Sequence, residues 1–204
     1  MRYTTLEYFQ AVPKNTLLRL RYDATNTGEF WWLHDRVEGD RVWGGFRYDG
    51  EDWVGIDDYL YEFMGEVCRG SGAEPLRLLT RLDPAKDPDR YRDVLGPPVL
   101  LPELPEAGES LQRETVLALP AGTCVLFTLP TNPTVQRFRY AHANGLEKGV
   151  PYGFLLEHAG DDRGVLTVLH QGESGLLLGG QPVQFHSVQL AEIHVRVRNL
   201  QLAG

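Results

Sequence analysis

The sequence predicts a mainly β protein of the α+β class: an antiparallel β-meander with one helix, followed by an all-β sandwich or barrel-like lobe. Three observations lead to this prediction. Apolar and polar residues alternate through much of the chain, which is the period of a half-buried strand. One stretch, near residues 57–68, changes to the 3.6-residue period of a helix. A proline-rich stretch then separates two parts of the chain.

Residues 1–82 are predicted to form the first lobe, a β-meander plus a helix. The segment 18–22 alternates leucine or tyrosine with arginine, and Phe30–Leu33 is apolar on both faces, as in a central strand. Asp49-Gly50 favours a tight hairpin turn because both residues tolerate positive φ. The helix over 57–68 follows from the shared face of Ile56, Leu60, Phe63 and Val67, and one more strand is predicted at 76–79.

Residues 83–112 are predicted to be a proline-rich strap, with one helical turn at 89–94. Residues 113–204 are predicted to form an antiparallel β lobe. In this lobe Phe138 and Tyr140 alternate with Arg137 and Arg139, which places the arginines on the outward face. The apolar phase slips near residues 187 and 191, which indicates a β-bulge or break at each. The predicted strands are 115–120, 123–130, 136–142, 152–158, 164–170, 176–186 and 188–199.

Composition bounds the possible partners and compartment. The net charge of −8 and the lack of a basic run disfavour a protein that binds nucleic acid alone, leaving nucleic acid as a minor contact within a complex. No apolar run is long enough to cross a bilayer, and residues 1–7 lack the apolar core of a signal peptide. We therefore expect a cytoplasmic protein with no membrane contact, in which Cys68 and Cys124 are reduced thiols. The strong preference for arginine over lysine indicates a GC-rich bacterial genome.

No complete catalytic or cofactor motif is present, so we expect no cofactor. His142, His170 and Glu173 would lie near one end of an up-down-up meander, but their spacing is not typical of a zinc site, and we expect no stoichiometric zinc. His186 and His194 flank the predicted bulge and fit a solvated or ion-paired edge better than an acid–base pair. The segment 172–175 lacks the spacing of a nucleophile elbow and reads as a hairpin turn.

Glycine pairs and acidic residues have structural explanations. The pairs at 44–45 and 179–180 lack the flanking residues of a phosphate loop, and inside strand patterns they mark a bulge or a close backbone approach. An acidic group lacks the spacing of a calcium loop and fits a solvated turn and a helix cap. Its members are Asp49, Glu51, Asp52, Asp57 and Asp58.

The tryptophan-rich first hairpin is the main interface candidate. Phe30, Trp32 and His34 are expected on one face of their strand, with Trp31, Leu33 and Asp35 on the other. The helix over 57–68 can cover one face only, so the other needs the second lobe or a partner. Arg196 and Arg198, two residues apart on a predicted late strand, would form a basic edge for an acidic partner or a phosphate backbone. The candidate interface residues are Trp31, Trp43, Arg196 and Arg198.

Two segments carry a family resemblance. The residues Trp31 to Asp35 and Gly39 to Gly44 resemble the opening hairpin of small accessory subunits of type III CRISPR effector complexes, and Val195 to Leu200 is similar to a late strand of that group. The resemblance implies a non-catalytic structural subunit that reaches RNA through its neighbours. It implies no catalytic residues.

The sequence therefore predicts a non-enzymatic structural or interaction subunit of a larger cytoplasmic assembly, with protein partners. The accessory CRISPR subunit is one version of this function. Two alternatives are a small-molecule-binding β-barrel and a hydrolase that uses the strand-end histidines. Either alternative needs a concave site with convergent polar groups.

Overall fold

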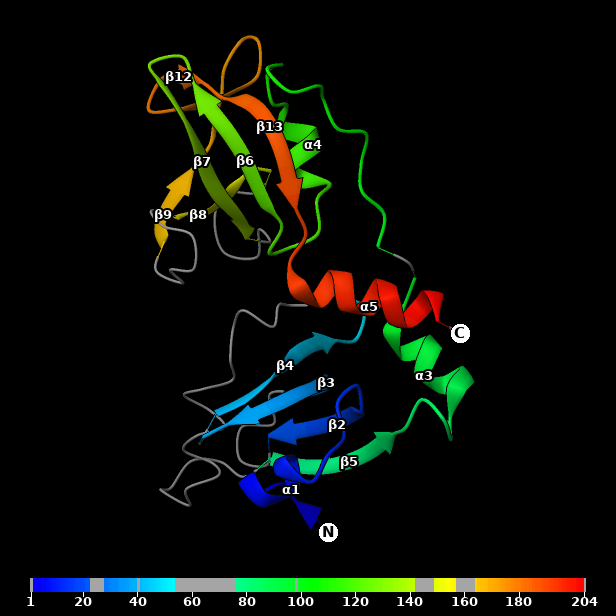
Figure 1. Ribbon diagram of the computed structural model, residues 1–204. Coiled ribbons are helices and arrows are strands. Elements are labelled where there is room, and N and C mark those ends of the chain that lie inside the picture. Colours follow the sequence, from blue (N-terminus) through cyan, green and yellow to red (C-terminus); the bar gives the residue numbers. More distant parts are fainter. Residues whose placement is uncertain are drawn as a thin grey trace. The chain divides into compact units, whose positions relative to one another are not determined.

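The computed structural model of the chain describes residues 2–22, 28–39, 41–53, 76–97, 99–141, 149–156 and 164–203. The chain divides into two compact units (Figure 1). Unit 1 holds Met1–Pro98 and Glu192–Gly204, and unit 2 holds Val99–Ala191. The fold is mainly β with antiparallel sheets and additional helices, which confirms the predicted fold class.

Unit 1 is built on a five-stranded antiparallel sheet with the order β1-β5-β2-β3-β4. A register shift between His34 and Arg36 interrupts the β3–β4 hairpin, so that Asp35 is an extra residue on β3. Gly44 on β4 lies against the Trp32 ring, and a Cβ there would collide with it, so this glycine allows a close approach as predicted. The strands are β1 (Arg2–Tyr3), β2 (Leu17–Tyr22), β3 (Glu29–Glu38), β4 (Arg41–Tyr48) and β5 (Leu76–Leu82).

Helices cover both faces of this sheet. Helix α1 (Leu6–Gln10), capped by the Thr5 hydroxyl, places Phe9 in a buried cluster with Trp32 and other residues of the same sheet face. The opposite face meets α3 (Pro88–Leu95), where the Arg47 guanidinium donates to the Val94 carbonyl over 2.9 Å. Helix α5 (Glu192–Leu202) lies beside α3, and Gln201 donates to the Pro97 carbonyl over 2.9 Å (Figure 1). No described helix is both long and apolar enough to span a membrane.

Unit 2 contains a second five-stranded antiparallel sheet, with the order β13-β6-β7-β8-β9, and a three-stranded sheet, β10-β11-β12. Its described helix is α4 (Arg113–Leu117). The large sheet consists of β6 (Cys124–Leu129), β7 (Asn132–Ala141), β8 (Tyr152–Leu156), β9 (Gly164–Val168) and β13 (Gln184–Gln189). The small sheet consists of β10 (His170–Gln171), β11 (Leu176–Leu178) and β12 (Gln181–Pro182).

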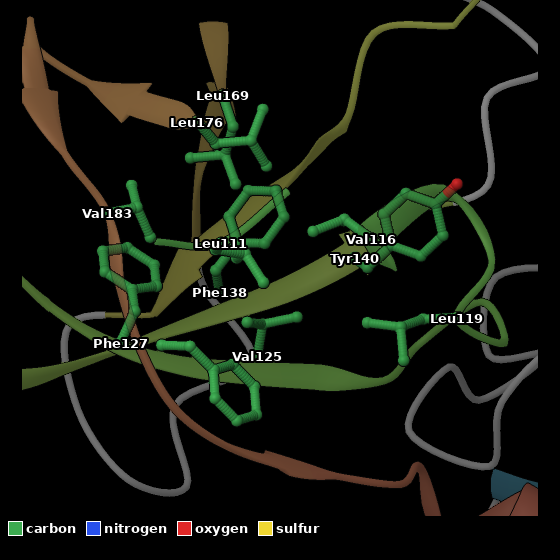
Figure 2. Close-up of a cluster of buried hydrophobic side chains, with 11 residues drawn as sticks. Leu111, Val116, Leu119, Val125, Phe127, Phe138, Tyr140, Leu169, Leu176 and Val183 are labelled. Atoms are coloured by element: carbon green, nitrogen blue, oxygen red, sulfur yellow. The ribbon is translucent and has the colours of Figure 1, made fainter. Parts of the chain in front are cut away.

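The core of unit 2 lies against one face of the large sheet. Val116 of α4 and Leu119 pack near side chains of β6 and β7. Leu169, just before β10, and Leu176, on β11, belong to the same cluster (Figure 2). Every member is at least nine-tenths buried. The cluster consists of Leu111, Val116, Leu119, Val125, Phe127, Phe138, Tyr140, Leu169, Leu176, Val183 and Phe185.

Several turn predictions are confirmed. A register shift occurs between Phe185 and Ser187, where the apolar phase slips. The segment 172–175 closes the β10–β11 hairpin, and the amide of Gly172 donates to the carbonyl of Gly175 over 2.8 Å. At 179–180 the sequence predicts a bulge or a close backbone approach inside a strand, and this is wrong: the pair forms the β11–β12 turn with φ values of 56° and 79°, which glycine adopts readily, and no described atom beyond the chain neighbours lies within 4 Å of the Cβ position of either glycine.

Three strand predictions are wrong. The predicted strand over 176–186 is divided by the turn at 179–180 into β11 and β12, and β13 then begins at Gln184. Residues 115–120 overlap the short helix α4. Residues 192–199 are helical as part of α5, so the predicted strand over 188–199 ends at Gln189, and the break predicted near residue 191 is the change from β13 to α5. The exposed Val195 produced an alternating pattern with Ile193 and Val197, but the buried positions repeat with the helical period. The predicted helix over 57–68 lies outside the described residues.

Candidate functional site

Unit 1 contains a cluster of charged side chains around a buried carboxylate. The side chain of Asp35 is 1% exposed, and its Oδ1 lies 3.1 Å from Nη1 of Arg196 and 2.6 Å from Nζ of Lys14. Its other oxygen pairs with the guanidinium of Arg36. One carboxylate therefore meets three cations, of which only Arg196 is buried.

Arg196 also binds the backbone and side chains near the start of β2. Its Nε donates to Oδ1 of Asn15 over 2.7 Å, and Nη2 donates to the carbonyl of His34. Asn15 has a φ of 67°, a left-handed conformation that asparagine tolerates better than most residues. The hydroxyl of Tyr91 donates to the Asn15 carbonyl over 2.5 Å. These contacts connect the C-terminal helix to the sheet and to α3.

The electrostatics of the cluster favour the ionised pair. Burial alone raises the pKa of Asp35, but hydrogen bonds from Lys14 and Arg36 and the charge of Arg196 outweigh it, so the pKa is lowered. Burial lowers the pKa of Arg196, and the Asp35 charge opposes that effect. An arginine stays protonated at neutral pH in either case. Asp35 and Arg196 are thus a buried ion pair with additional hydrogen bonds.

Two neutral groups border the pair. Burial, followed by the positive charge of Arg196, lowers the pKa of His34 to about 4. The His34 ring lies 5.9 Å from the Phe9 ring, and its buried Nδ1 has no hydrogen-bond partner. Burial also raises the pKa of Tyr91 to about 12. Both groups are therefore uncharged at neutral pH.

The chemistry of this cluster is structural. A general base needs a carboxylate oxygen that a substrate proton can reach, whereas both oxygens of Asp35 are occupied by cations inside the fold. Breaking a buried pair leaves an uncompensated charge, so we expect the loss of either partner to destabilise the packing of α5 on the sheet. The sequence places Asp35 on the same strand face as Trp31 and Leu33 but does not indicate its partner, because Arg196 lies on a different element, 162 positions from the neighbouring His34 that it also contacts.

Trp31 and Trp43 both lie against arginines of their own sheet. The guanidinium carbon of Arg19 is 5.3 Å from the centre of the Trp31 ring, and that of Arg36 is 4.9 Å from the Trp43 ring. Arg19 is in turn fixed by Asp49, whose carboxylate accepts two hydrogen bonds of 2.7 and 2.6 Å. Both tryptophans are half-buried. Part of the cover predicted to come from a partner or the second lobe is therefore intramolecular.

Arg196 and Arg198 do not form the predicted basic edge. On a strand, residues two apart point the same way, but on a helix they are about 200° apart around the axis. Arg196 is accordingly buried against Asp35, while Arg198 is exposed. The prediction of a paired basic edge is wrong because the segment is helical.

The histidine candidates are not brought together. His170 and Glu173 are both exposed at the β10–β11 hairpin, and His142 and His158 lie outside the described residues. Nδ1 of His186 lies 3.0 Å from Oγ of Ser187, but the ring is exposed on an edge strand and no described carboxylate orients it. His194 is buried in α5. Among the described parts of the chain, no three histidine, cysteine or acidic side chains are grouped as metal ligands.

The large sheet of unit 2 has a second face that points away from the core cluster. Leu126, Arg137 and Leu156 form one row of paired residues across β6, β7 and β8. Arg139, Phe154 and Leu166 form a second row across β7, β8 and β9. We call these residues, together with Tyr152 and Val168, the outer face; none of them belongs to the core cluster. Leu166 is 56% exposed and the other seven are half-buried.

The outer face is apolar with two cations. The Arg139 guanidinium carbon lies 5.5 Å from the centre of the Phe154 ring, and neither arginine forms an ion pair with a described carboxylate. The outer face itself contains no acidic residue, in a chain of net charge −8. The alternation at 137–140 predicted the outward arginines. The apolar partners were not identified as a surface, because that depends on the register of three neighbouring strands.

Comparison of the chain with family models, curated proteins and solved structures finds no match. The site is therefore interpreted from its own residues.

Proposed function

We propose that the protein is a non-enzymatic interaction subunit of a larger cytoplasmic assembly, which contacts a partner protein through the outer face of unit 2. The observation that carries the proposal is the outer face itself, where large apolar side chains flank two arginines that lack acidic partners among the described residues. A sheet usually buries its apolar residues against another layer. Contiguous apolar area on a surface is typical of an interaction site.

The ionisable groups of unit 1 support the same proposal. Asp35 and Arg196 are held in a cluster inside the fold, and Asp49 fixes Arg19 beside Trp31. In these contacts the charged groups stabilise the fold, with no reactive group presented to a substrate. An enzyme would need a positioned nucleophile or base within reach of a bound molecule.

A narrower version of the proposal is an accessory subunit of a type III CRISPR complex. The resembling segment from Trp31 to Gly44 lies on the β3–β4 hairpin, as the resemblance implies. The resembling segment from Val195 to Leu200 is helical and departs from the implied strand. A guide RNA and effector subunits that co-elute with the protein would support this version.

The test is affinity purification from the native host with variants of the outer face. We expect at least one partner protein to co-elute in fixed proportion with the wild type and to be lost from the double variant Leu126→Ser, Leu156→Ser. The matched control is Leu100→Ser, Leu202→Ser, at leucines that are 79% and 75% exposed and lie outside the outer face. Equal melting temperatures for the two variants would show that the loss reflects contact.

Two results would contradict the proposal. One is a wild-type protein that elutes alone. The other is a set of co-eluting proteins that is the same for the outer-face variant and the control.

A further inference from the structure

The two arginines of the outer face have a defined spacing. Arg137 and Arg139 are two residues apart on β7 and point the same way, which separates their Cα atoms by about 7 Å. On an α-helix, residues i and i+4 share a face and are separated by about 6 Å along the axis. Two carboxylates one helical turn apart therefore match the two guanidinium groups.

Apolar residues lie on both sides of this pair of arginines. Arg137 is between Leu126 of β6 and Leu156 of β8, and Arg139 is next to Phe154 of β8. When a helix lies along β7 with its acidic residues over the two arginines, the residues on either side of that acidic stripe face the apolar side chains of β6 and β8. The opposite face of the same sheet is already covered by α4 and the rest of the core cluster (Figure 2).

We propose that the outer face binds an amphipathic α-helix of a partner protein, whose two carboxylates, one turn apart, bind Arg137 and Arg139 while its apolar side chains pack on Leu126, Leu156 and Phe154. This inference rests on the proposed function and adds the chemistry of the partner. The bound helix adds a layer on the outer face of the sheet.

Charge and preorganisation favour this occupant. Arginine binds a carboxylate through two parallel N–H groups, and a guanidinium stacked on an aromatic ring keeps its N–H edge available. Arg139 is stacked in this way on Phe154. A second copy of the chain bound through the same face would place arginines against arginines, which is unfavourable.

A protein helix fits the face better than single-stranded nucleic acid. Nucleic-acid platforms stack successive bases on aromatic rings within a basic groove. The outer face has two aromatic residues, Tyr152 and Phe154, against four aliphatic ones, so it offers few rings on which bases could stack.

The experiment measures binding of the full chain to three fluorescent probes by anisotropy. The first probe is a helical peptide with a pair of glutamates at i and i+4 flanked on both sides by leucines, the second is the same peptide with glutamine for glutamate, and the third is an oligouridine. We expect the glutamate peptide to bind at least about tenfold more tightly than the glutamine peptide, since charge-assisted hydrogen bonds supply the difference. Raising the salt concentration from about 0.05 to about 0.5 M should reduce that difference.

The matched variants are Arg137→Glu, Arg139→Glu and the control Arg90→Glu, Arg113→Glu, which changes the net charge equally on α3 and α4. The outer-face variant should lose the preference for the glutamate peptide, and the control should keep it. The inference is overturned by equal binding of the two peptides, by no peptide binding, or by preferential binding of oligouridine. If the host partner is lost with Leu126→Ser, Leu156→Ser but kept with Arg137→Glu, Arg139→Glu, the proposed function stands and the acidic partner is wrong.

Discussion

Unit 1 and unit 2 each contain a five-stranded antiparallel sheet, but Arg196 of α5 in unit 1 and the two arginines of β7 in unit 2 have different surroundings. In unit 1 both faces are covered by helices, and the buried Arg196 pairs with Asp35. In unit 2 the core cluster lies against one face of the large sheet, and Arg137 and Arg139 of the other face pair with no described carboxylate. Arg196 thus stabilises the fold, whereas Arg137 and Arg139 are candidates for contact with a partner.

The energetic reason is solvation. A guanidinium taken out of water needs a carboxylate and further hydrogen bonds, and in unit 1 it has both. A half-buried guanidinium keeps contact with water, so it needs no internal partner and its stem can cover apolar side chains. Substitutions should therefore destabilise unit 1 at its paired charges and leave the stability of unit 2 nearly unchanged at its unpaired ones.

The largest expected effect is that of Asp35→Ala. The change leaves Arg196 buried without its carboxylate, and we expect the free energy of unfolding to fall by about 3–5 kcal/mol. Urea denaturation measures the loss. The control is Asp49→Ala, which removes an exposed partner of Arg19 and should cost about 0–1 kcal/mol.

A double variant sharpens this prediction. Asp35→Leu combined with Arg196→Met replaces the buried pair by apolar side chains, and it should recover most of the stability lost in Asp35→Ala. If Asp35→Ala costs no more than Asp49→Ala, the pair is not the contact that fixes α5.

Much of the fold follows from sequence patterns. The alternation at 18–22 and 137–140 located β2 and β7, and the phase slip near Ser187 located the bulge in β13. These features depend on neighbouring residues, which a local pattern contains. Helix α5 was missed because its segment has both a period of 2 and a period of 3.6, and only the long-range pairing of Arg196 with Asp35 distinguishes them.

The candidate sites were harder to predict from the sequence because they too depend on contacts between residues far apart in the chain. Trp31 and Trp43 were identified from sequence, but the arginines that stack on them belong to other positions of the sheet. The outer face depends on which strands are adjacent and in which register, and that information is tertiary.

The second prediction concerns pH. The pKa of His34 falls from 6.5 to about 4 on folding, so the stabilisation that depends on its neutral ring is complete above pH 6.5 and is lost as the pH falls toward 4. The shift corresponds to about 3 kcal/mol. The lowered pKa of Asp35 acts at lower pH, because its stabilisation is lost only as the pH falls below 3.8.

The measurement is the free energy of unfolding between pH 7 and pH 4 for the wild type and His34→Phe. We expect the variant to lose most of the slope in this window, whatever its stability at pH 7. The exposed histidine provides the control, since His186→Gln should keep the slope. A His34→Phe curve parallel to that of the wild type would contradict the assignment.

The last prediction concerns Trp31→Ala and Trp43→Ala, whose effect on stability should be smaller than that of Asp35→Ala. Each change removes a half-buried ring and its contact with Arg19 or Arg36, and we expect a loss of about 1–2 kcal/mol, against about 3–5 kcal/mol for the fully buried Trp32→Ala. If the tryptophans also contact a partner, as the sequence predicts, the co-eluting protein should be lost from Trp31→Ala at temperatures well below its melting point. Thermal unfolding and affinity purification of the same samples separate these effects. Retention of the partner by both variants would restrict the interface to unit 2. A loss of stability comparable to that of Trp32→Ala would show that Trp31 and Trp43 belong to the core and are covered by their arginines.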